Sequence, residues 1–517
     1  MSSFEAGLTR VVDSRAMQEI DRRAQEEFGT PALVLMESAG LLGWLELRSR
    51  LGEPAVAEPG RARSGPKLCF LAGKGNNGGD ALVMARYALR DGYQVTIVLA
   101  ATPGQLGEQA RLHARIIEAQ NARVLVWSEQ TDACRSTIAS AHVIVDGLAG
   151  TGIKGALRSP LDAMCAAAND SAGEIVAVDA PSGLSDQWRS EMPAVRAKWT
   201  LTMGLPKTCL YAPSARPLCG EIIRIGVSFP PQLTSSSEIH GVLLEPRDLG
   251  IILPPISDEA YKHRRGVVGV FAGSVGTTGA AVLAAEGAQR CRAGLVTIYA
   301  DDEIYPIVAS TVKSVMARRR MSIAALGDTA LDAVVVGPGW GVTPERRSLL
   351  NDLLSAIPKG VIDADGLNLL AGMDSAPSLS EEWVLTPHPG ELARLLDRST
   401  GEVRESFLAS VRELAARSGA VVVGKSNVTM IARPDGRFAI VDGMNPALGT
   451  GGTGDVLAGA IAGLLAGGMS GWQAACAGTL AHQMAGRSLR DRSGIFLAEE
   501  LPAELGRVVD VRTHPQR

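Results

Sequence analysis

A glycine-rich loop near the C-terminus carries residues whose types and order could do chemistry. Residues 449–454 read Gly-Thr-Gly-Gly-Thr-Gly, Asp455 follows, and residues 456–465 form an apolar run typical of a buried helix. Backbone N–H groups at a helix start carry partial positive charge, so this loop could hold a transferring phosphoryl group. Asp455 would repel that phosphate, but it could accept the proton of an attacking hydroxyl, and the helix N-terminus would keep it ionised at neutral pH. The alternative is that Asp455 only caps a turn.

Three loops in the first half could form a second site. Residues 73–80 read Gly-Lys-Gly-Asn-Asn-Gly-Gly-Asp, which contains the G-x-G-x-x-G pattern of dinucleotide binders. The acid that such binders place about 20 residues later is missing from residues 97–101. Residues 146–152 and 179–184 also follow expected strands, and in open α/β sheets such loops meet in one crevice. Each aspartate alone could be a turn residue, but the three loops together favour a site.

Composition narrows the class of protein. The chain has 517 residues, which predicts two to four domains, and its net charge of −4 without a basic block argues against nucleic-acid and membrane-surface binders. The seven cysteines are scattered without a C-x-x-C pair, so neither a disulfide framework nor a zinc site is expected. This cysteine usage predicts a protein of the reducing cytosol. No signal peptide is evident, and the run 456–465 is too short to span a bilayer.

The elements that must position these loops alternate between short apolar runs and helix-like segments, which predicts parallel strands joined by crossover helices. In the first half we expect helices at 14–27, 32–47, 81–90 and 109–119, and strands at 68–72, 95–99, 143–146, 175–179 and 199–203. Residues 52–65, rich in Pro, Gly and Ala, are expected to form a surface loop.

A Pro- and Ser-rich stretch begins near residue 230, and a second α/β series follows it. Its expected strands are 267–272, 295–299, 333–337, 360–363, 383–386 and 420–424, and a hairpin of 428–433 with 438–442 turns on Pro434-Asp435-Gly436. The sequence therefore predicts two doubly wound α/β domains, residues 1–235 and residues 236–517.

The N-terminal loops resemble the epimerase domain for hydrated NADH and NADPH, a match that covers roughly residues 10–230. It also includes Leu-Met-Glu-Ser-Ala-Gly at 35–40 and the segment 197–207 that ends in Pro-Lys. The resemblance implies a Rossmann-like fold, a potassium ion held by the oxygen donors of Asn77, Asp146 and Ser182, and proton transfer by Asp179. It implies a substrate lining of Asn76, Asn77, Gly78, Gly79, Asp80, Gly150, Thr151, Gly152, Ile153, Lys154, Gly155 and Ala156. Two positions depart from the family, Ala81 in place of Gly and Ala149 in place of Phe.

The C-terminal motifs resemble the ribokinase-like dehydratase that repairs the same hydrates. No P-loop lysine pattern is present, and six ordered segments match over about 200 residues, among them Thr-Pro-His-Pro-Gly-Glu at 386–391. The resemblance implies that Ala280, Gly339 and His388 contact the hydrate, with Asp455 as the base. It assigns the nucleotide to Lys425, Ser426, Asn427, Val428, Thr429, Gly451, Gly452, Thr453 and Gly454.

Several of these assignments leave alternatives open. His388 could be structural, or its neutral imidazole could hydrogen-bond the substrate. The spacing of His388 and Glu391 matches ribokinase-like magnesium sites, so Glu391 would orient hydrated Mg²⁺. Asp363 and Asp365 could help, or could form a capped turn. Ser426 replaces the family's glycine and would be strained if the backbone there needs a positive φ.

Together the two resemblances imply a cytosolic repair enzyme. Its N-terminal half would interconvert the R and S hydrates NADHX and NADPHX, and its C-terminal half would dehydrate the S form with ADP as co-substrate, which releases AMP and phosphate. Potassium and magnesium would assist, no nucleic acid or membrane is expected, and a homo-oligomer is expected by analogy. The alternatives are a vitamin or sugar kinase on the ribokinase-like fold and an N-terminal half that only binds nucleotides or partners.

Overall fold

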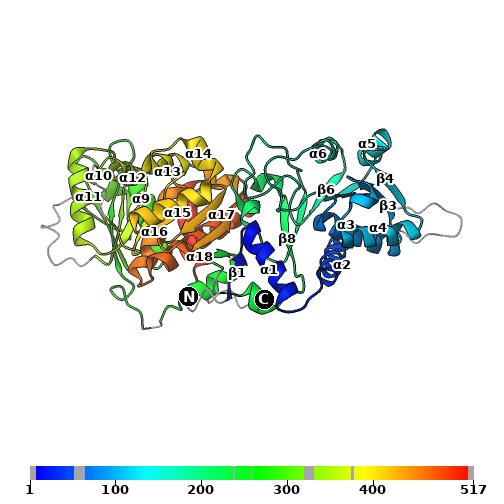
Figure 1. The fold of residues 1–517 in the computed structure, drawn as a ribbon. Coiled ribbons are helices and arrows are strands. Elements are labelled where there is room, and N and C mark those ends of the chain that lie inside the picture. Colours follow the sequence, from blue (N-terminus) through cyan, green and yellow to red (C-terminus); the bar gives the residue numbers. More distant parts are fainter. Residues whose placement is uncertain are drawn as a thin grey trace. The chain divides into compact units, whose positions relative to one another are not determined.

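The computed structural model describes residues 7–51, 65–236, 239–257, 259–319, 331–373 and 378–510. By their contacts the residues form two compact units, one of Arg10–Ile239 and the other of Met1–Thr9 with His240–Arg517 (Figure 1). Leu8 is buried in the core of the second unit, whereas the boundaries expected from the sequence placed it in the first. Apart from Gly65, the loop expected at 52–65 lies outside the described residues.

The first unit is built on a seven-stranded parallel sheet with the order β4-β3-β2-β5-β6-β7-β8. Its strands are β2 (Lys67–Ala72), β3 (Gln94–Leu99), β4 (Arg123–Val126), β5 (Val143–Gly147), β6 (Glu174–Val178), β7 (Trp199–Met203) and β8 (Glu221–Ile225). The five expected strands are confirmed. Because the strand order reverses between β2 and β5, the loops that follow these two strands open a crevice at the carboxyl edge of the sheet.

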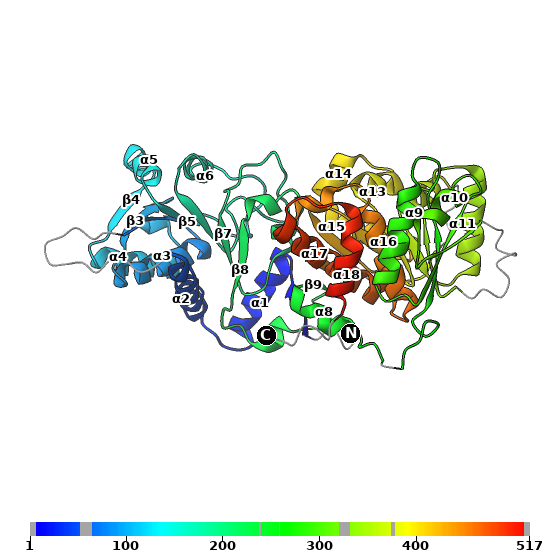
Figure 2. The same ribbon diagram turned by 180° about the vertical axis from the view of Figure 1, so that it is seen from behind.

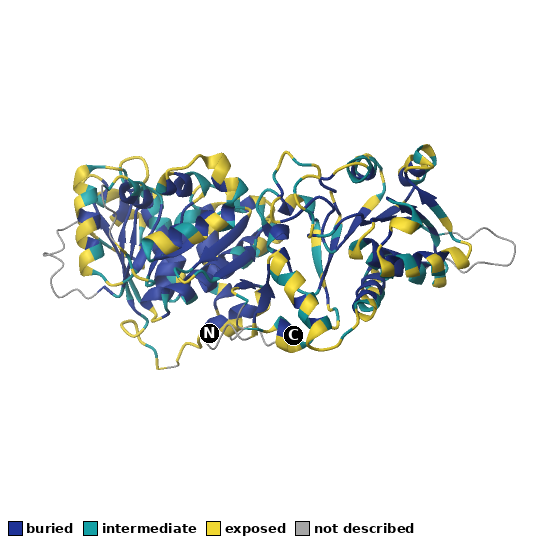
Figure 3. Ribbon diagram, in the orientation of Figure 1, coloured by how far each residue is buried: buried dark blue, intermediate teal, exposed yellow. Residues whose placement is uncertain are grey.

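Helices cover both faces of this sheet. They are α1 (Ser14–Glu26), α2 (Ala32–Leu51), α3 (Asn76–Arg90), α4 (Glu108–Ala119), α5 (Thr131–Ala139), α6 (Leu161–Asn169) and α7 (Pro231–Thr234). One apolar cluster joins α2, α3 and α4 to the sheet, and a separate cluster joins α5 and α6 to it, which puts the two groups on opposite faces. The central strands are buried while the outer helix faces are exposed (Figure 3).

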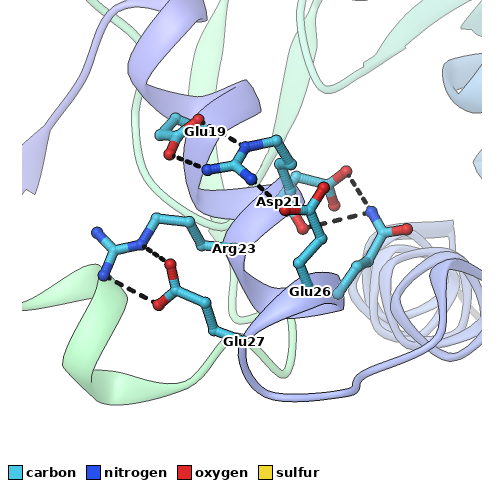
Figure 4. Close-up of polar contacts among 7 residues, drawn as sticks. Glu19, Asp21, Arg23, Glu26 and Glu27 are labelled. Atoms are coloured by element: carbon cyan, nitrogen blue, oxygen red, sulfur yellow. Dashed lines mark hydrogen bonds and ion pairs between the residues drawn. The ribbon is translucent and has the colours of Figure 1, made fainter.

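Helix α1 begins at the N-cap Asp13, whose carboxylate accepts the N–H of Ala16 at 2.7 Å. Its outer face carries exposed ion pairs, such as that of Arg23 with Glu27, which stabilise the helix only slightly (Figure 4). On the same helix Gln25 Nε2 donates to Asp21 Oδ2 at 2.9 Å (Figure 4). This bond fixes the carboxylate of Asp21, which lines the cavity described below.

The second unit contains an eleven-stranded mixed sheet with the order β1-β9-β18-β17-β16-β15-β14-β13-β10-β11-β12. Its strands are β1 (Thr9–Val11), β9 (Gly241–Leu243), β10 (Val267–Phe271), β11 (Leu295–Ala300), β12 (Met316–Arg319), β13 (Ala333–Val336), β14 (Gly360–Ile362), β15 (Trp383–Leu385), β16 (Val421–Gly424), β17 (Val428–Ala432) and β18 (Phe438–Asp442). Strands β10 to β16 are parallel, and β17 and β18 form the expected antiparallel hairpin.

The helices of this unit also divide between the two faces. They are α8 (Leu249–Ile252), α9 (Thr278–Arg290), α10 (Tyr305–Thr311), α11 (Pro344–Ala356), α12 (Asp365–Ala371), α13 (Pro389–Leu396), α14 (Thr400–Glu405), α15 (Phe407–Ser418), α16 (Thr453–Ala466), α17 (Gly471–Ser493) and α18 (Leu501–Val508). Helices α9, α16, α17 and α18 share one apolar cluster with the sheet, and each of them is labelled in Figure 2. On the other face, a Cβ built on Gly424 would lie 2.4 Å from Val411 of α15.

Helix α16 is the buried helix that the apolar run predicted. It packs closely against α9, because a Cβ on Gly459 would lie 1.9 Å from the carbonyl oxygen of Ala284, so only glycine permits this approach. The close contact fixes the start of α16, where the glycine-rich loop ends. No helix in the described part of the chain is both long and apolar enough to cross a membrane.

Candidate active sites

The first unit contains a cavity of about 1230 Å³ beside the loops that follow β2, β5 and β6. Most of the predicted substrate residues line it, namely Asn76, Asn77, Asp80, Gly150, Thr151, Gly152, Ile153, Lys154 and Ala156, together with Asp179. Gly78, Gly79 and Gly155 do not. A Cβ on Gly78 would lie 2.0 Å from the carbonyl oxygen of Gly73, and one on Gly79 would lie 2.5 Å from Met36 Cε, so both serve close packing.

Of the three predicted potassium ligands, Asp146 and Ser182 are hydrogen-bonded to each other, and Asn77 lines the cavity. Ser182 donates its N–H to Asp146 Oδ2 at 2.8 Å and its hydroxyl to Asp146 Oδ1 at 2.6 Å. Burial raises the pKa of Asp146 to about 6, although bonds from Ser182 and Leu148 oppose the shift. The side-chain oxygen and nitrogen of Asn77 are buried without a partner among the described residues. The chemistry of these donors, an amide oxygen without a partner, a buried carboxylate and a hydroxyl, fits a large cation that binds oxygen.

Asp179 stands at the end of β6 in an unusual backbone conformation, with φ +66°. Its Oδ1 accepts the N–H of Met203 at 3.2 Å and the ammonium of Lys207. A Cβ on Gly150 would lie 3.4 Å from its Oδ2, which places that oxygen against the substrate loop. Lys207 also lines the cavity, and it was missed as a site residue because no motif spacing links it to Asp179.

Two further carboxyl groups line the same cavity. Burial, the charge of Asp179 and the charge of Asp21 raise the pKa of Asp80 well above its usual value. Burial also raises the pKa of Asp21. A protonated Asp80 would donate a hydrogen bond to a substrate oxygen. Of the two departures from the family, Ala81 is buried in α3 away from the cavity, whereas Ala149 is part of the cavity wall, where it fills less space than phenylalanine.

In the second unit Asp455 lies in the first turn of α16, beside an ion pair. Lys425 Nζ lies 2.6 Å from Asp363 Oδ1, and a Cβ on Gly454 would lie 3.4 Å from the same Nζ. Burial and the charge of Asp363 raise the pKa of Asp455 to about 7, against the opposing charge of Lys425. A pKa of about 7 leaves this carboxylate only partly ionised at neutral pH, whereas the helix N-terminus was expected to keep it ionised. A pKa near the working pH suits a general base.

His388 and Glu391 cap helix α13 reciprocally. The Nδ1 of His388 accepts the N–H groups of Gly390 and Glu391 at 3.0 and 3.3 Å, and Glu391 Oε2 accepts the N–H of His388 at 2.8 Å. His388 thus has the structural role of a helix cap that was considered as an alternative to substrate binding. Its Nε2 lies 3.4 Å from Glu391 Oε1. The described residues contain no group of three or more His, Cys, Asp or Glu side chains that could hold a metal.

The predicted hydrate contacts Ala280 and Gly339 lie together. A Cβ on Gly339 would lie 3.0 Å from that of Ala280, and the Gly339 carbonyl accepts the Thr277 hydroxyl at 2.7 Å. Asp365 accepts the N–H of Gly341 at 2.7 Å, which supports the capped-turn alternative for it. Ser426 is not among the residues with positive φ, so the strain considered for it does not arise.

The predicted nucleotide residues come from two segments of the chain, which meet where Lys425 lies beside Gly454. Val428 and Thr429 are buried in β17, while Gly451 is exposed and Gly452 caps α16 with φ +94°. Sequence reasoning missed His482 of α17, whose Nε2 lies 2.9 Å from the carbonyl oxygen of Thr453. Burial lowers the pKa of His482 to about 4, so the neutral ring donates to this carbonyl and fixes the end of the glycine-rich loop.

Comparison with known proteins places the two units in one family. The family model described as NAD(P)H-hydrate dehydratase matches residues 268–507, and the model described as YjeF-related protein N-terminus matches residues 32–209. The bifunctional NAD(P)H-hydrate repair enzyme of Coxiella burnetii is 36% identical over 94% of this chain and 96% of its own. The chain belongs to the bifunctional NAD(P)H-hydrate repair enzymes.

Other members of the family match over similar lengths. The repair enzyme of Moorella thermoacetica is 34% identical over 92% of both chains, and that of Escherichia coli is 33% identical over 92% of both. Among solved structures, an ADP/ATP-dependent NAD(P)H-hydrate dehydratase of Bacillus subtilis, co-crystallised with ATP and Mg²⁺, is 29% identical. It covers 51% of this chain and 96% of its own, with a TM-score of 0.48.

Proposed function

We propose that this repair enzyme restores hydrated NADH and NADPH in two steps. The N-terminal unit epimerises the R and S hydrates, and the C-terminal unit dehydrates the S form at the expense of ADP. The observation that carries the proposal is the pairing of two family matches in one chain with a carboxylate poised in each site, Asp179 and Asp455. A kinase function alone would not account for the family match of the N-terminal unit.

In the C-terminal unit Asp455 accepts the proton of the hydroxyl on carbon 6 of the hydrated ring. The freed oxygen attacks the terminal phosphoryl group of ADP, AMP departs, and backbone N–H groups of residues 451–454 stabilise the developing charge. Lys425, held by Asp363 beside the first turn of α16, adds positive charge at the same place. Phosphate then leaves carbon 6 as carbon 5 loses a proton, which regenerates the dihydronicotinamide.

Substrate contacts in this unit follow from the predicted residues. Ala280 and Gly339 form a wall of small residues that lets the ring approach the backbone, and the Nε2–H of His388 is available to a substrate oxygen. For Mg²⁺ the fit is indirect, because Glu391 accepts a backbone N–H through Oε2, and its Oε1, which lies 3.4 Å from His388 Nε2, would orient metal-bound water. When bound, the ion would neutralise the charge of the diphosphate.

In the N-terminal unit Asp179 moves the proton beside the hydroxylated ring carbon, and Asp80 holds a substrate oxygen. Residues 150–156 and the start of α3 enclose the substrate. Asn77, Asp146 and Ser182 would hold a potassium ion, which would neutralise Asp146 and stabilise the loops that follow β5 and β6. The smaller Ala149 leaves a wider cavity wall, and epimerisation is proposed despite this departure.

We also place the enzyme in the cytoplasm as a homo-oligomer. All seven cysteines are free and buried, which fits a reducing compartment. Its partners in this proposal are small molecules, NADHX, NADPHX and ADP.

Product analysis tests the proposed dehydration. S hydrate is incubated with ADP and Mg²⁺, and NAD(P)H, AMP and phosphate are counted. Equal amounts of the three products support the proposal. A stable phosphorylated alcohol without release of phosphate would instead indicate a kinase.

A further inference from the structure

Lys207 is a lysine whose side chain is buried to 1% exposure in the N-terminal unit. Its ammonium donates to the Asp179 carboxylate, to the carbonyl oxygen of Met203 at 2.5 Å and to Thr202 Oγ1 at 3.2 Å. Three donors thus meet three acceptors, so the buried ammonium has its full set of hydrogen bonds. Such a group is a fixed positive charge at the wall of the cavity.

The backbone on both sides of Lys207 is hydrogen-bonded to Val12. The N–H of Val12 donates to the carbonyl of Pro206 at 3.0 Å, and the N–H of Thr208 donates to the carbonyl of Val12 at 2.8 Å. The Lys207 backbone therefore sits in a short parallel bridge with Val12. An ammonium with so little freedom can define where its partner carboxylate lies.

The consequence for Asp179 is that its two oxygens differ. Oδ1 is engaged by the ammonium and by the N–H of Met203, whereas no hydrogen bond to Oδ2 is found among the described residues. Oδ2 faces the loop at Gly150, on the substrate side of the cavity. Fixing one oxygen leaves the other in one orientation for proton transfer.

We infer that Lys207 is a positioning residue of the epimerase site, which anchors Oδ1 of Asp179 so that Oδ2 meets the substrate. This inference rests on the proposed epimerase function. Lys207 acts through Asp179 and needs no contact with the reacting carbon. Its loss should lower kcat for epimerisation more than it changes KM, because the cavity surface that binds the dinucleotide stays intact.

The test compares Lys207→Met, which keeps most of the packing volume, with Lys207→Ala and with the surface control Lys198→Met. Lys198 is an apt control, since its ammonium pairs with Glu174 while its side chain is 49% exposed. Conversion of R to S hydrate is measured in the whole chain, and dehydration of pure S hydrate in the same sample reports that the other unit is folded. Propylammonium, which replaces the deleted part of the side chain, is added to Lys207→Ala, with propanol as a neutral match.

We expect Lys207→Met to lose about 10²-fold in kcat for epimerisation, as a displaced catalytic group does, with dehydration and Lys198→Met unchanged. Propylammonium should restore activity to Lys207→Ala, and propanol should not. The inference is overturned if Lys207→Met keeps kcat within about threefold of the parent while Asp179→Asn is inactive, or if propanol rescues as well as the amine. If the parent chain itself shows no epimerisation, the proposed epimerase function is wrong, and the inference about Lys207 falls with it.

Discussion

The charge of Asp363 offers a sharp test of how the dehydratase base is tuned. Asp363 is 1% exposed at the end of β14, and it holds Lys425 while it raises the pKa of Asp455. In Asp363→Asn the like charge disappears and Lys425 is free to pair with Asp455. Both changes favour the ionised form, so the pKa of Asp455 should fall.

The size of the effect follows from the pKa of about 7. With that value about one tenth of the base is ionised at pH 6 and about nine tenths at pH 8. Loss of a nearby like charge and gain of an opposite one should lower the pKa by about one to two units. For each enzyme, kcat/KM at pH 6 is divided by its value on the high-pH plateau, and this ratio should be about five- to tenfold higher in Asp363→Asn than in the parent. The plateau value of kcat/KM should itself be lower in Asp363→Asn, because its Asp455 is a weaker base.

The assay is the pH profile of kcat/KM for S hydrate, with both substrates far below saturation so that the profile reports the free enzyme. Asp365→Asn serves as the control, because Asp365 caps the Gly341 turn and is not among the charges that shift Asp455. The control should keep the acid limb near pH 7. In Asp363→Asn the acid limb of the kcat/KM profile should move to lower pH. If it stays in place or moves to higher pH, the electrostatic reasoning is refuted.

Three further outcomes follow from the two sites. Asp455→Asn should lower dehydration of S hydrate by about 10²–10⁴-fold while R-to-S conversion in the same chain is unchanged, and loss of both activities would contradict this. Gly73→Ala places a Cβ 1.8 Å from the carbonyl oxygen of Leu148, whereas the Cβ of Gly75→Ala has no atom within 4 Å. Only Gly73→Ala should therefore destabilise the N-terminal unit, by about 1–3 kcal/mol in urea unfolding. Equal urea midpoints for the two variants would count against the packing described. Replacing potassium by tetramethylammonium at constant ionic strength should lower both epimerase activity and the melting temperature of the N-terminal unit. The Asp146→Asn variant should be insensitive to this exchange. An equal response of parent and variant would argue against the ion site.

The sequence predicted the central strands of both sheets because their apolar runs are continuous and bounded by turns. It did not predict the edge strands. β8 reads Glu-Ile-Ile-Arg-Ile and β12 reads Met-Ala-Arg-Arg. β8 is only partly buried and β12 is largely exposed, so both lack the buried pattern on which such predictions depend. The edge strand β1 and its neighbour β9, each three residues long, were not predicted either. Strand order itself depends on packing between distant segments.

The sites were predictable where residue types and local spacing set the chemistry. The loops at residues 73–80 and 146–152 could be placed at a strand end without coordinates. The ionisation of Asp455 could not, because it depends on Asp363 and Lys425, which come from other strands. The same holds for Lys207, whose role follows from its burial against Asp179 and from no motif.

Recovery of dihydronicotinamide absorbance from a mixture of R and S hydrates, with ADP, Mg²⁺ and potassium, tests the central claim most directly. Full recovery is predicted, since the N-terminal unit feeds R hydrate to the dehydratase, and Asp179→Asn should stop at the S portion. If the parent chain also stops at the S portion, the epimerase half of the account is wrong. If no absorbance returns from S hydrate, the repair function itself is contradicted.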